Sequence, residues 1–462
     1  MTMLRLTELL RDARERDDGF SIIEVLVAMT VFAMIAAGVA MGIASSLYLA
    51  HGSRSREVAI GLAQDAIDKA RTSSNLFGVT DATDSLTRNG VDYSVKQTAR
   101  WVPTSGTANA CGSGGGPLAY KRVSMTISWT AGGRGATQSI SMNSMVAPTT
   151  SVTAANLGTI VVSVSKVNGS GNQGVGVTIA PNASNPNGAA AITSTIGQTD
   201  VTGCTYALNV KPGRYDVTLT KPGNIDDGTS SGSLGAQTAR PSTTVTVQTN
   251  QTSAANFNYD TALTVVPQWS DPDQSTTAFT PPTSSPVSLR RKTADYGPYA
   301  AGTTAQVFPY ADGYKAVPGT PATCLSVDPE NWTTAKGTAV APRALAQPQA
   351  GTNAVKAPVQ IVTVKLASKT DNALTATTVA PAANSGDPGC ATPVTYTFTG
   401  LSNQTATIAL PYGTYSFQSG TVLKIIGGIV SLTLSSGTPS ATPAAGVSTS
   451  SGKVLLDPRR AP

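Results

Sequence analysis

Few side chains in this sequence of 462 residues are of the types that perform chemistry. It contains a single histidine, His51, which lies next to a long apolar segment. One histidine excludes a site built from several histidine ligands, and His51 is not a suitable base for a Ser-His pair. The motif GTSSG at 228–232 matches a nucleophile pattern, but neither a strand before it nor a helix after it is predicted. We therefore expect that the protein is not an enzyme.

Acidic pairs are the remaining candidates for metal binding. Asp226-Asp227 and Asp271-x-Asp273 each offer two carboxylates, without the further oxygen ligands that a calcium loop needs. We interpret both pairs as solvated turns. The four cysteines form no CxxC motif, which argues against zinc. No metal and no cofactor are expected.

The junction between Gly19 and Phe20 separates two very different segments. A hydrophilic leader rich in arginine and acidic residues ends at Gly19, and an apolar run of 31 residues, Phe20 to Ala50, follows with Glu24 as its one charge. The run exceeds the roughly 20 residues that a helix needs to cross a bilayer. Arginines in the leader favour a cytoplasmic N-terminus. We predict a single-pass membrane protein whose remaining residues lie outside the cytoplasm.

The stretch GFSIIEVLVAM, which starts at Gly19, resembles the class III signal of type IV prepilins and pseudopilins. The resemblance implies that a prepilin peptidase cuts after Gly19 and that the new N-terminal Phe20 is methylated. It also implies a partner for Glu24, the amino group of Phe20 on a neighbouring subunit. A buried carboxylate needs such a partner, because an unpaired charge in hydrocarbon is costly. The alternative is a plain membrane anchor that contains a glutamate.

The residues after the apolar run predict a pilin-like spine and headpiece. SREVAIGLAQDAIDKAR continues the helical pattern, so one helix is expected from about Phe20 to Arg71, with an apolar stripe of Val58, Leu62, Ala66, Ala59, Ala63 and Ala70. From 72 to 148 the period changes to two, which predicts a small antiparallel sheet. The end of this segment, 121–148, is similar to minor pilins and pseudopilins of the PilV-like subgroup.

Two copies of one β-unit follow a Thr, Ser and Ala linker at 149–155. The segments 159–181 and 359–381 align without a gap at an offset of 200 residues, and Gly213 and Tyr215 meet Gly413 and Tyr415 further along. The first copy resembles the carboxypeptidase regulatory-like, or Cna-B-like, sandwich of seven strands. We predict one sandwich at 156–260 and a second sandwich with a tail at 355–462. The Pro- and aromatic-rich segment 261–354 is interpreted as irregular, partly stranded structure packed beside the second sandwich.

The four cysteines all lie on the predicted outer side of the membrane, where disulfides persist. We expect Cys324 to pair with Cys390, because both belong to the C-terminal part. Cys111 and Cys204 then either pair across domains or remain free.

The expected fold is an α+β pilin headpiece on a long N-terminal transmembrane α-helix, followed by all-β sandwich domains. Two functions fit it. One is a minor pilin or pseudopilin of a type IV filament or a type II secretion-like machine, with prepilin peptidase, other pilins and the inner or cytoplasmic membrane as partners. The other is a surface-anchored adhesin or binding protein that is not built into a filament and contacts a surface ligand. No specific nucleic-acid binding is expected, because the net charge of +6 is spread along the chain.

Overall fold

The structure is a computed structural model that describes residues 21–103, 109–113, 116–130, 136–148, 152–230, 236–271, 278–332, 353–426, 429–435 and 437–459. The chain divides into two compact units. The first consists of Met1–Arg100 and Tyr120–Thr149, and the second of Trp101–Ala119 and Thr150–Pro462. The segment 101–119, which includes the end of one strand of the first sheet and the start of the next, is grouped with the second unit.

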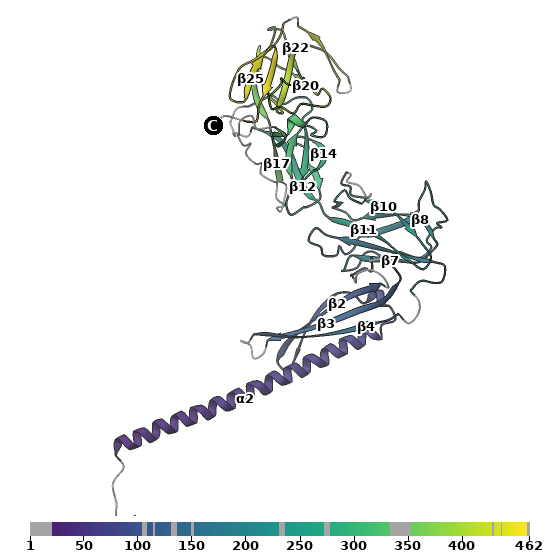
Figure 1. The fold of residues 1–462 in the computed structure, drawn as a ribbon, viewed down its shortest axis with the longest axis vertical. Coiled ribbons are helices and arrows are strands. Elements are labelled where there is room, and N and C mark those ends of the chain that lie inside the picture. Colours follow the sequence, from purple (N-terminus) through teal and green to yellow (C-terminus); the bar gives the residue numbers. More distant parts are fainter. Residues whose placement is uncertain are drawn as a thin grey trace, which may run out of the picture. The chain divides into compact units, whose positions relative to one another are not determined.

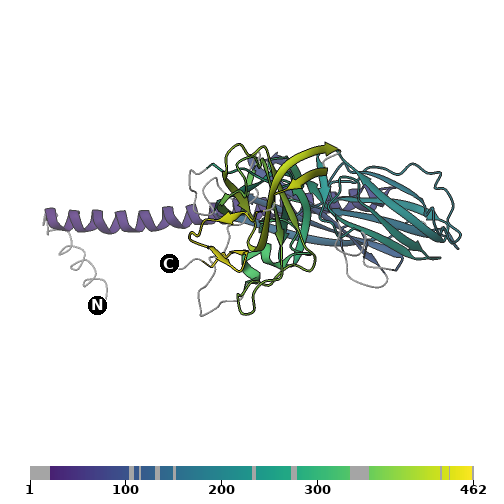
Figure 2. The same cartoon turned by 90° about the horizontal axis from the view of Figure 1, so that it is seen from above.

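The first unit is built on one uninterrupted helix, α2 (Ile22–Arg71), which confirms the predicted spine (Figures 1 and 2). Its N-terminal half projects beyond the sheet of the same unit, and its C-terminal half lies along that sheet. Small side chains at helical spacing allow this close packing. The buried positions are Ser55, Ala59, Ala63, Ile67 and Ala70. Val58, Leu62 and Ala66 of the predicted stripe are only half-buried and lie at its edge.

The sheet of the first unit has four antiparallel strands in sequential order. They are β1 (Ala82–Arg88), β2 (Val91–Pro103), β3 (Leu118–Thr130) and β4 (Thr137–Val146). Asn89 and Gly90 both have positive φ, as a tight hairpin between β1 and β2 requires. Alternate residues of β3 contribute apolar side chains to the core, namely Val123, Met125, Ile127 and Trp129.

The second unit begins with a sandwich of two sheets that share one apolar core. One sheet has the order β10-β8-β6 and the other β7-β5-β11-β9, where β11 runs parallel to β5. The strands are β5 (Gly158–Ser165), β6 (Gly176–Pro181), β7 (Cys204–Val210), β8 (Gly213–Thr220), β9 (Asn224–Asp226), β10 (Ser242–Val247) and β11 (Thr252–Thr261). Val245 and Val247 close the first sheet, whereas Phe257 and Tyr259 belong to the second.

A further pair of small sheets follows in the region where the sequence predicts irregular, partly stranded structure beside the second sandwich. The sheets have the orders β15-β12-β17 and β14-β13-β16. Their strands are β12 (Leu263–Ser270), β13 (Pro286–Arg291), β14 (Ala294–Ala300), β15 (Ala305–Val307), β16 (Lys315–Pro318) and β17 (Asn353–Pro358). The strand β17 pairs in parallel with β12, so residues 353–358 belong to this region and not to the second sandwich. The buried aromatic side chains of the region 261–354, such as Trp269, Tyr296 and Tyr314, belong to an apolar core.

The second sandwich contains the sheet β21-β18-β24 and a larger sheet built around β22. Its strands are β18 (Gln360–Lys365), β19 (Ala373–Thr378), β20 (Thr395–Thr399), β21 (Thr405–Leu410), β22 (Gly413–Ile426), β23 (Ile429–Leu434), β24 (Ser440–Ala441), β25 (Val447–Ser450) and β26 (Lys453–Leu456). One apolar cluster runs from Leu263 to Leu456. The region of β12–β17 therefore shares its core with the second sandwich.

The internal repeat is visible in the strand pairing and at one turn. β5 pairs antiparallel with β7 and β6 with β8, as β18 does with β21 and β19 with β22. Tyr215 donates its hydroxyl hydrogen bond to the Lys211 carbonyl at 2.9 Å, and Tyr415 donates to the Pro411 carbonyl at the same distance. The turn of the first copy contains Gly213 with a φ of 152°, and the turn of the second copy contains Gly413 with a φ of 147°. Each copy thus contains its own tyrosine corner, and the two corners have the same hydrogen bond.

A buried ion-pair group supports the shared C-terminal core and yields a stability prediction. The Arg290 guanidinium contacts Asp295 at 2.7 Å and Asp328 at 2.5 Å, and only 2% of the Asp328 side chain is exposed. Arg290→Ala should lower the free energy of unfolding by about 3–5 kcal/mol, because it removes a guanidinium that pairs with a buried carboxylate. Lys315→Ala removes the half-exposed pair with Glu330 and should cost less than about 1 kcal/mol. Denaturant titration measures both, and equal losses would contradict the prediction.

Candidate assembly site

Glu24 lies in the first turn of α2, whose N-cap residue is Ser21. The Ser21 carbonyl accepts hydrogen bonds from the backbone N–H groups of Glu24 and Val25 at 2.9 and 3.1 Å. Ala28 and Phe32 follow Glu24 at helical spacing on the same face. Gly19 and Phe20, the predicted processing residues, lie outside the described residues.

The apolar half of α2 is the largest exposed hydrophobic surface in the described part of the chain. Every residue from Ser21 to Ala50 is exposed, including Ile22 at 84% and Phe32 at 74%. The helix is long and apolar enough to cross a membrane. Such a continuous apolar surface needs either lipid or other apolar helices around it. Glu24 is its only charged side chain.

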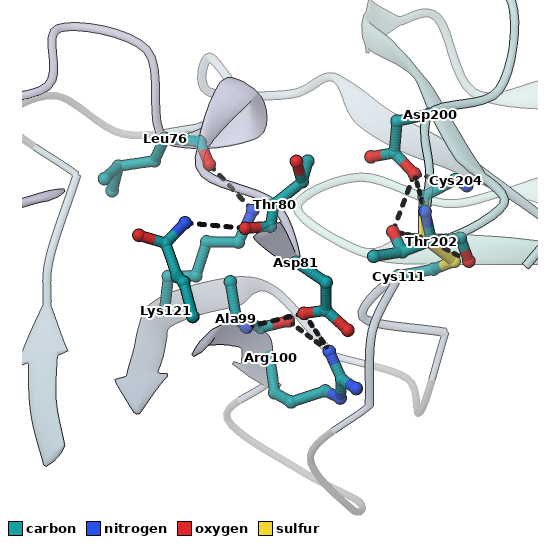
Figure 3. Close-up of polar contacts among 11 residues, drawn as sticks. Leu76, Thr80, Asp81, Ala99, Arg100, Cys111, Lys121, Asp200, Thr202 and Cys204 are labelled. Carbon is teal, nitrogen blue, oxygen red and sulfur yellow. Dashed lines mark hydrogen bonds and ion pairs between the residues drawn. A yellow bond between two sulfur atoms is a disulfide. The ribbon is translucent and has the colours of Figure 1, made fainter. Parts of the chain in front are cut away.

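The connection between α2 and the sheet is fixed by polar contacts to backbone carbonyls (Figure 3). The buried Lys121 ammonium donates to the Leu76 carbonyl at 2.7 Å, and the Gln97 amide donates to the Thr80 carbonyl at 2.6 Å. At the end of α2, the Arg71 guanidinium donates to the Ser144 hydroxyl at 3.1 Å. These side chains satisfy carbonyls in a loop that lacks strand partners, so the helix is held firmly on its sheet.

Asp81 also links the segment after α2 to the sheet, through contacts with strand β2. Its Oδ1 accepts a hydrogen bond from the Ala99 N–H at 2.8 Å and from the Arg100 guanidinium at 2.7 Å (Figure 3). Asp81 and Arg100 are about one-third exposed, so the pair orients the chain more than it stabilises it. The sequence does not single out Asp81, Arg100 or Lys121, because the groups that they contact lie 18 to 45 positions away along the chain.

All four cysteines form disulfides within the second unit. Cys111, in the loop between β2 and β3, is bonded to Cys204 at the start of β7, and Cys324 is bonded to Cys390. The Asp200 carboxylate shapes the turn before Cys204, where it accepts hydrogen bonds from the backbone N–H groups of Thr202 and Cys204 at 2.8 and 3.0 Å (Figure 3).

A second contact accompanies the Cys111–Cys204 disulfide. The indole N–H of the fully buried Trp101 donates to the Tyr206 hydroxyl at 3.1 Å, and burial raises the pKa of Tyr206. Cys111 and Trp101 are therefore joined to strand β7 of the first sandwich by a covalent bond and by a hydrogen bond, respectively.

The acidic pair Asp226-Asp227 differs from the prediction of a solvated turn. Both residues are buried, and burial is the main cause of the raised pKa of Asp226. Asp226 accepts from the Thr238 N–H at 2.6 Å and the Ser230 hydroxyl at 2.7 Å, while Asp227 accepts from the Asn258 amide at 2.7 Å. These bonds make the pair a structural loop anchor. Sequence alone could not show that Asp226 is in hydrogen-bonding contact with Thr238, twelve positions away.

The other sequence-predicted chemical features form no catalytic group in the described part of the chain. No cluster of three or more His, Cys, Asp or Glu residues that could hold a metal occurs among the described residues. The motif at 228–232 and the pair Asp271-x-Asp273 each extend outside the described residues.

Comparison with known proteins concentrates on the N-terminus. The family described as the prokaryotic N-terminal methylation motif matches residues 15–40. No curated protein matches the chain. Among solved structures, the Bacillus anthracis TIE protein aligns at 11% identity over 77% of this chain and 70% of that chain, with a TM-score of 0.19. A score that low supports no argument about fold or function.

The motif match covers the leader end, the Gly19-Phe20 junction and the first half of the exposed apolar helix. It agrees with the exposed membrane-length helix and with the position of Glu24. The chain therefore carries a type IV pilin-like N-terminal methylation motif at residues 15–40, and this motif leads into a helix that is long and apolar enough to cross a membrane.

Proposed function

We propose that this protein is a minor pilin or pseudopilin subunit of a type IV filament or a type II secretion-like machine. The observation that supports it most is the placement of one charge, Glu24, near the start of a fully exposed apolar half-helix that carries the methylation motif. A plain anchor would have no use for that charge, since a carboxylate weakens insertion.

In the proposed assembly, the exposed half of α2 leaves the lipid and packs among the same segments of other subunits. The Glu24 carboxylate pairs with the methylated amine of Phe20 on a neighbour. Both charges are then buried together, which is far less costly than burying either alone. The contacts of Lys121, Gln97 and Asp81 keep the headpiece rigid on the upper half of the same helix.

The appended domains favour a minor position in the filament. About 310 residues follow the headpiece, and they form sandwiches with complete cores of their own. Domains of this size would crowd a closely packed shaft, whereas a subunit at the tip or in low number can display them. The resemblances to PilV-like headpieces and to Cna-B-like sandwiches agree with this proposal.

The proposed partners are prepilin peptidase, other pilins and the membrane that holds the subunit before assembly. The arginines of the leader favour a cytoplasmic N-terminus, which puts the sandwiches outside. Both disulfides fit that oxidising location. We propose no catalytic activity, and the acidic pair with the most burial serves as a loop anchor.

Processing provides the direct test of this proposal. Gly19→Leu should abolish cleavage, because it puts a bulky side chain directly before the scissile bond, where the peptidase must recognise the chain. The uncleaved precursor should then accumulate in membranes. Gly19→Ala is the matched control and should retain partial cleavage. Intact-mass and N-terminal mass spectrometry should find wild-type chains that begin at methylated Phe20. A mature chain that begins elsewhere would overturn the proposal.

A further inference from the structure

A cavity lies where α2 meets the tip of the β1–β2 hairpin in the first unit. Its volume is about 250 Å³, and its described lining residues are His51, Arg54, Ser55, Val58, Asn89, Val91 and Tyr93. None of these lining residues is acidic. The cavity is smaller than the roughly 300–1,000 Å³ of sites for drug-sized ligands, so it suits a small polar group.

Two of its polar side chains are available for a ligand. Neither the His51 imidazole nor the Arg54 guanidinium takes part in a hydrogen bond or ion pair with the described residues. Ser55 and Tyr93 are instead occupied, since the Ser55 hydroxyl donates to the His51 carbonyl and the Tyr93 hydroxyl donates to the Ser55 carbonyl at 3.2 Å. An unpaired guanidinium beside a cavity is suited to phosphate, which it binds through two parallel hydrogen bonds.

The height of the cavity along α2 indicates the source of that phosphate. Glu24 and His51 are 27 positions apart, which corresponds to about 40 Å of helix. A bilayer with its headgroups is about 40–45 Å thick, so Glu24 at the cytoplasmic surface puts His51 and Arg54 among the outer headgroups. Tyr48, which is 56% exposed, lies one turn below, where membrane proteins favour tyrosine.

The surface below the cavity suits lipid chains. Leu47 and Ile43 precede His51 at intervals of four residues on the same face of α2, and they are 66% and 57% exposed. A phosphate held by Arg54 would leave its acyl chains beside these side chains. This part of α2 therefore offers polar side chains to the headgroup of a phospholipid and, below them, apolar side chains to its acyl chains.

We propose that this cavity binds the headgroup phosphate of a phospholipid in the outer leaflet while the subunit waits in the membrane. The bound lipid fixes the depth of α2 and the orientation of the headpiece before assembly. This inference rests on the proposed function only in assuming insertion before assembly. Nearby charges that do not line the cavity are Arg56, Glu57, Arg88 and Asp92.

The test uses the full chain purified in detergent. Binding of short-chain phosphatidylglycerol, of the matching diacylglycerol without phosphate and of inorganic phosphate is measured by native mass spectrometry. Wild type should bind phosphatidylglycerol best, and Arg54→Ala should weaken that binding at least about tenfold, as expected for a charged hydrogen-bond pair. His51→Gln should weaken it less.

Arg56→Ala is the matched control. Arg56 lies two residues after Arg54, is exposed and does not line the cavity, so the substitution removes an equal charge from outside the site. It should change binding less than twofold. Equal losses in the Arg54 and Arg56 variants would show diffuse surface charge and overturn the proposal, as would equal binding of inorganic phosphate. Circular dichroism confirms that each variant is folded. Processing at Gly19 is measured separately, so a failure of this inference leaves the proposed function testable.

Discussion

Glu24→Ala should leave the subunit inserted in the membrane and cleaved, but nearly absent from filaments. Loss of a charge from an apolar helix favours insertion, and the scissile bond after Gly19 is unchanged. In the assembled state, however, the methylated amine of Phe20 on a neighbour would be buried without its carboxylate. That unpaired charge should cost several kcal/mol for each contact, which corresponds to a loss of 100-fold or more in incorporation. Immunoblots of sheared filaments and of membranes measure the distribution.

Two further variants show whether charge itself is responsible. Glu24→Gln keeps a hydrogen-bonding group without the charge and should give a milder defect. Glu57→Gln removes a carboxylate from the exposed part of the same helix and should leave incorporation unchanged. Normal recovery of cleaved Glu24→Ala subunits in filaments would show that the glutamate is not an assembly contact.

The second large effect concerns the Cys111–Cys204 disulfide. Cys111 precedes the linker at 149–155 and Cys204 follows it, so the bond joins the two sides of the linker covalently. If a specific protease site is inserted after Pro148 and cut, wild-type protein should still migrate as one species on a non-reducing gel. Cys111→Ser protein should separate into two fragments. The bond should also contribute about 2–5 kcal/mol to stability, because it closes a loop with a sequence separation of 93 residues.

A control distinguishes this disulfide from the other one. The double variant Cys324→Ser, Cys390→Ser removes a bond that lies wholly on the C-terminal side of the cut, so its fragments should stay joined. Addition of reductant to cut wild-type protein should release the fragments without any mutation. If cut wild-type protein separates without reductant, the pairing is wrong.

The sequence predicted most of the elements in which local pattern and burial agree. The helix from Ile22 to Arg71 and the strand that buries Val123 and Trp129 follow directly from their periods of 3.6 and 2. For the region 261–354 the sequence predicts only irregular, partly stranded structure, whereas the structure contains two small sheets there. Its strands are short and interrupted by Pro and Gly, and β12 finds a partner in β17, which lies far along the chain. Local pattern cannot reveal such pairing.

The candidate site was predictable where it depends on the type and spacing of neighbouring residues. Glu24 can be identified from the sequence, because a charged residue within an apolar run is energetically costly and usually has a functional role. The contacts of Lys121 with Leu76 and of Asp81 with Ala99 could not be predicted, since they join residues that are 45 and 18 positions apart through backbone groups. The same holds for the cavity that His51 and Arg54 share with the hairpin residue Asn89.

Mass spectrometry of purified surface filaments tests most directly whether this chain is assembled into them as a pilin-like subunit, as we propose. Filaments sheared from cells should contain a chain that begins at methylated Phe20 and extends through the C-terminal sandwich. The same mature chain should be depleted from filaments by Glu24→Ala. Recovery of the wild-type chain only in the membrane fraction of cells that make normal filaments would contradict the account.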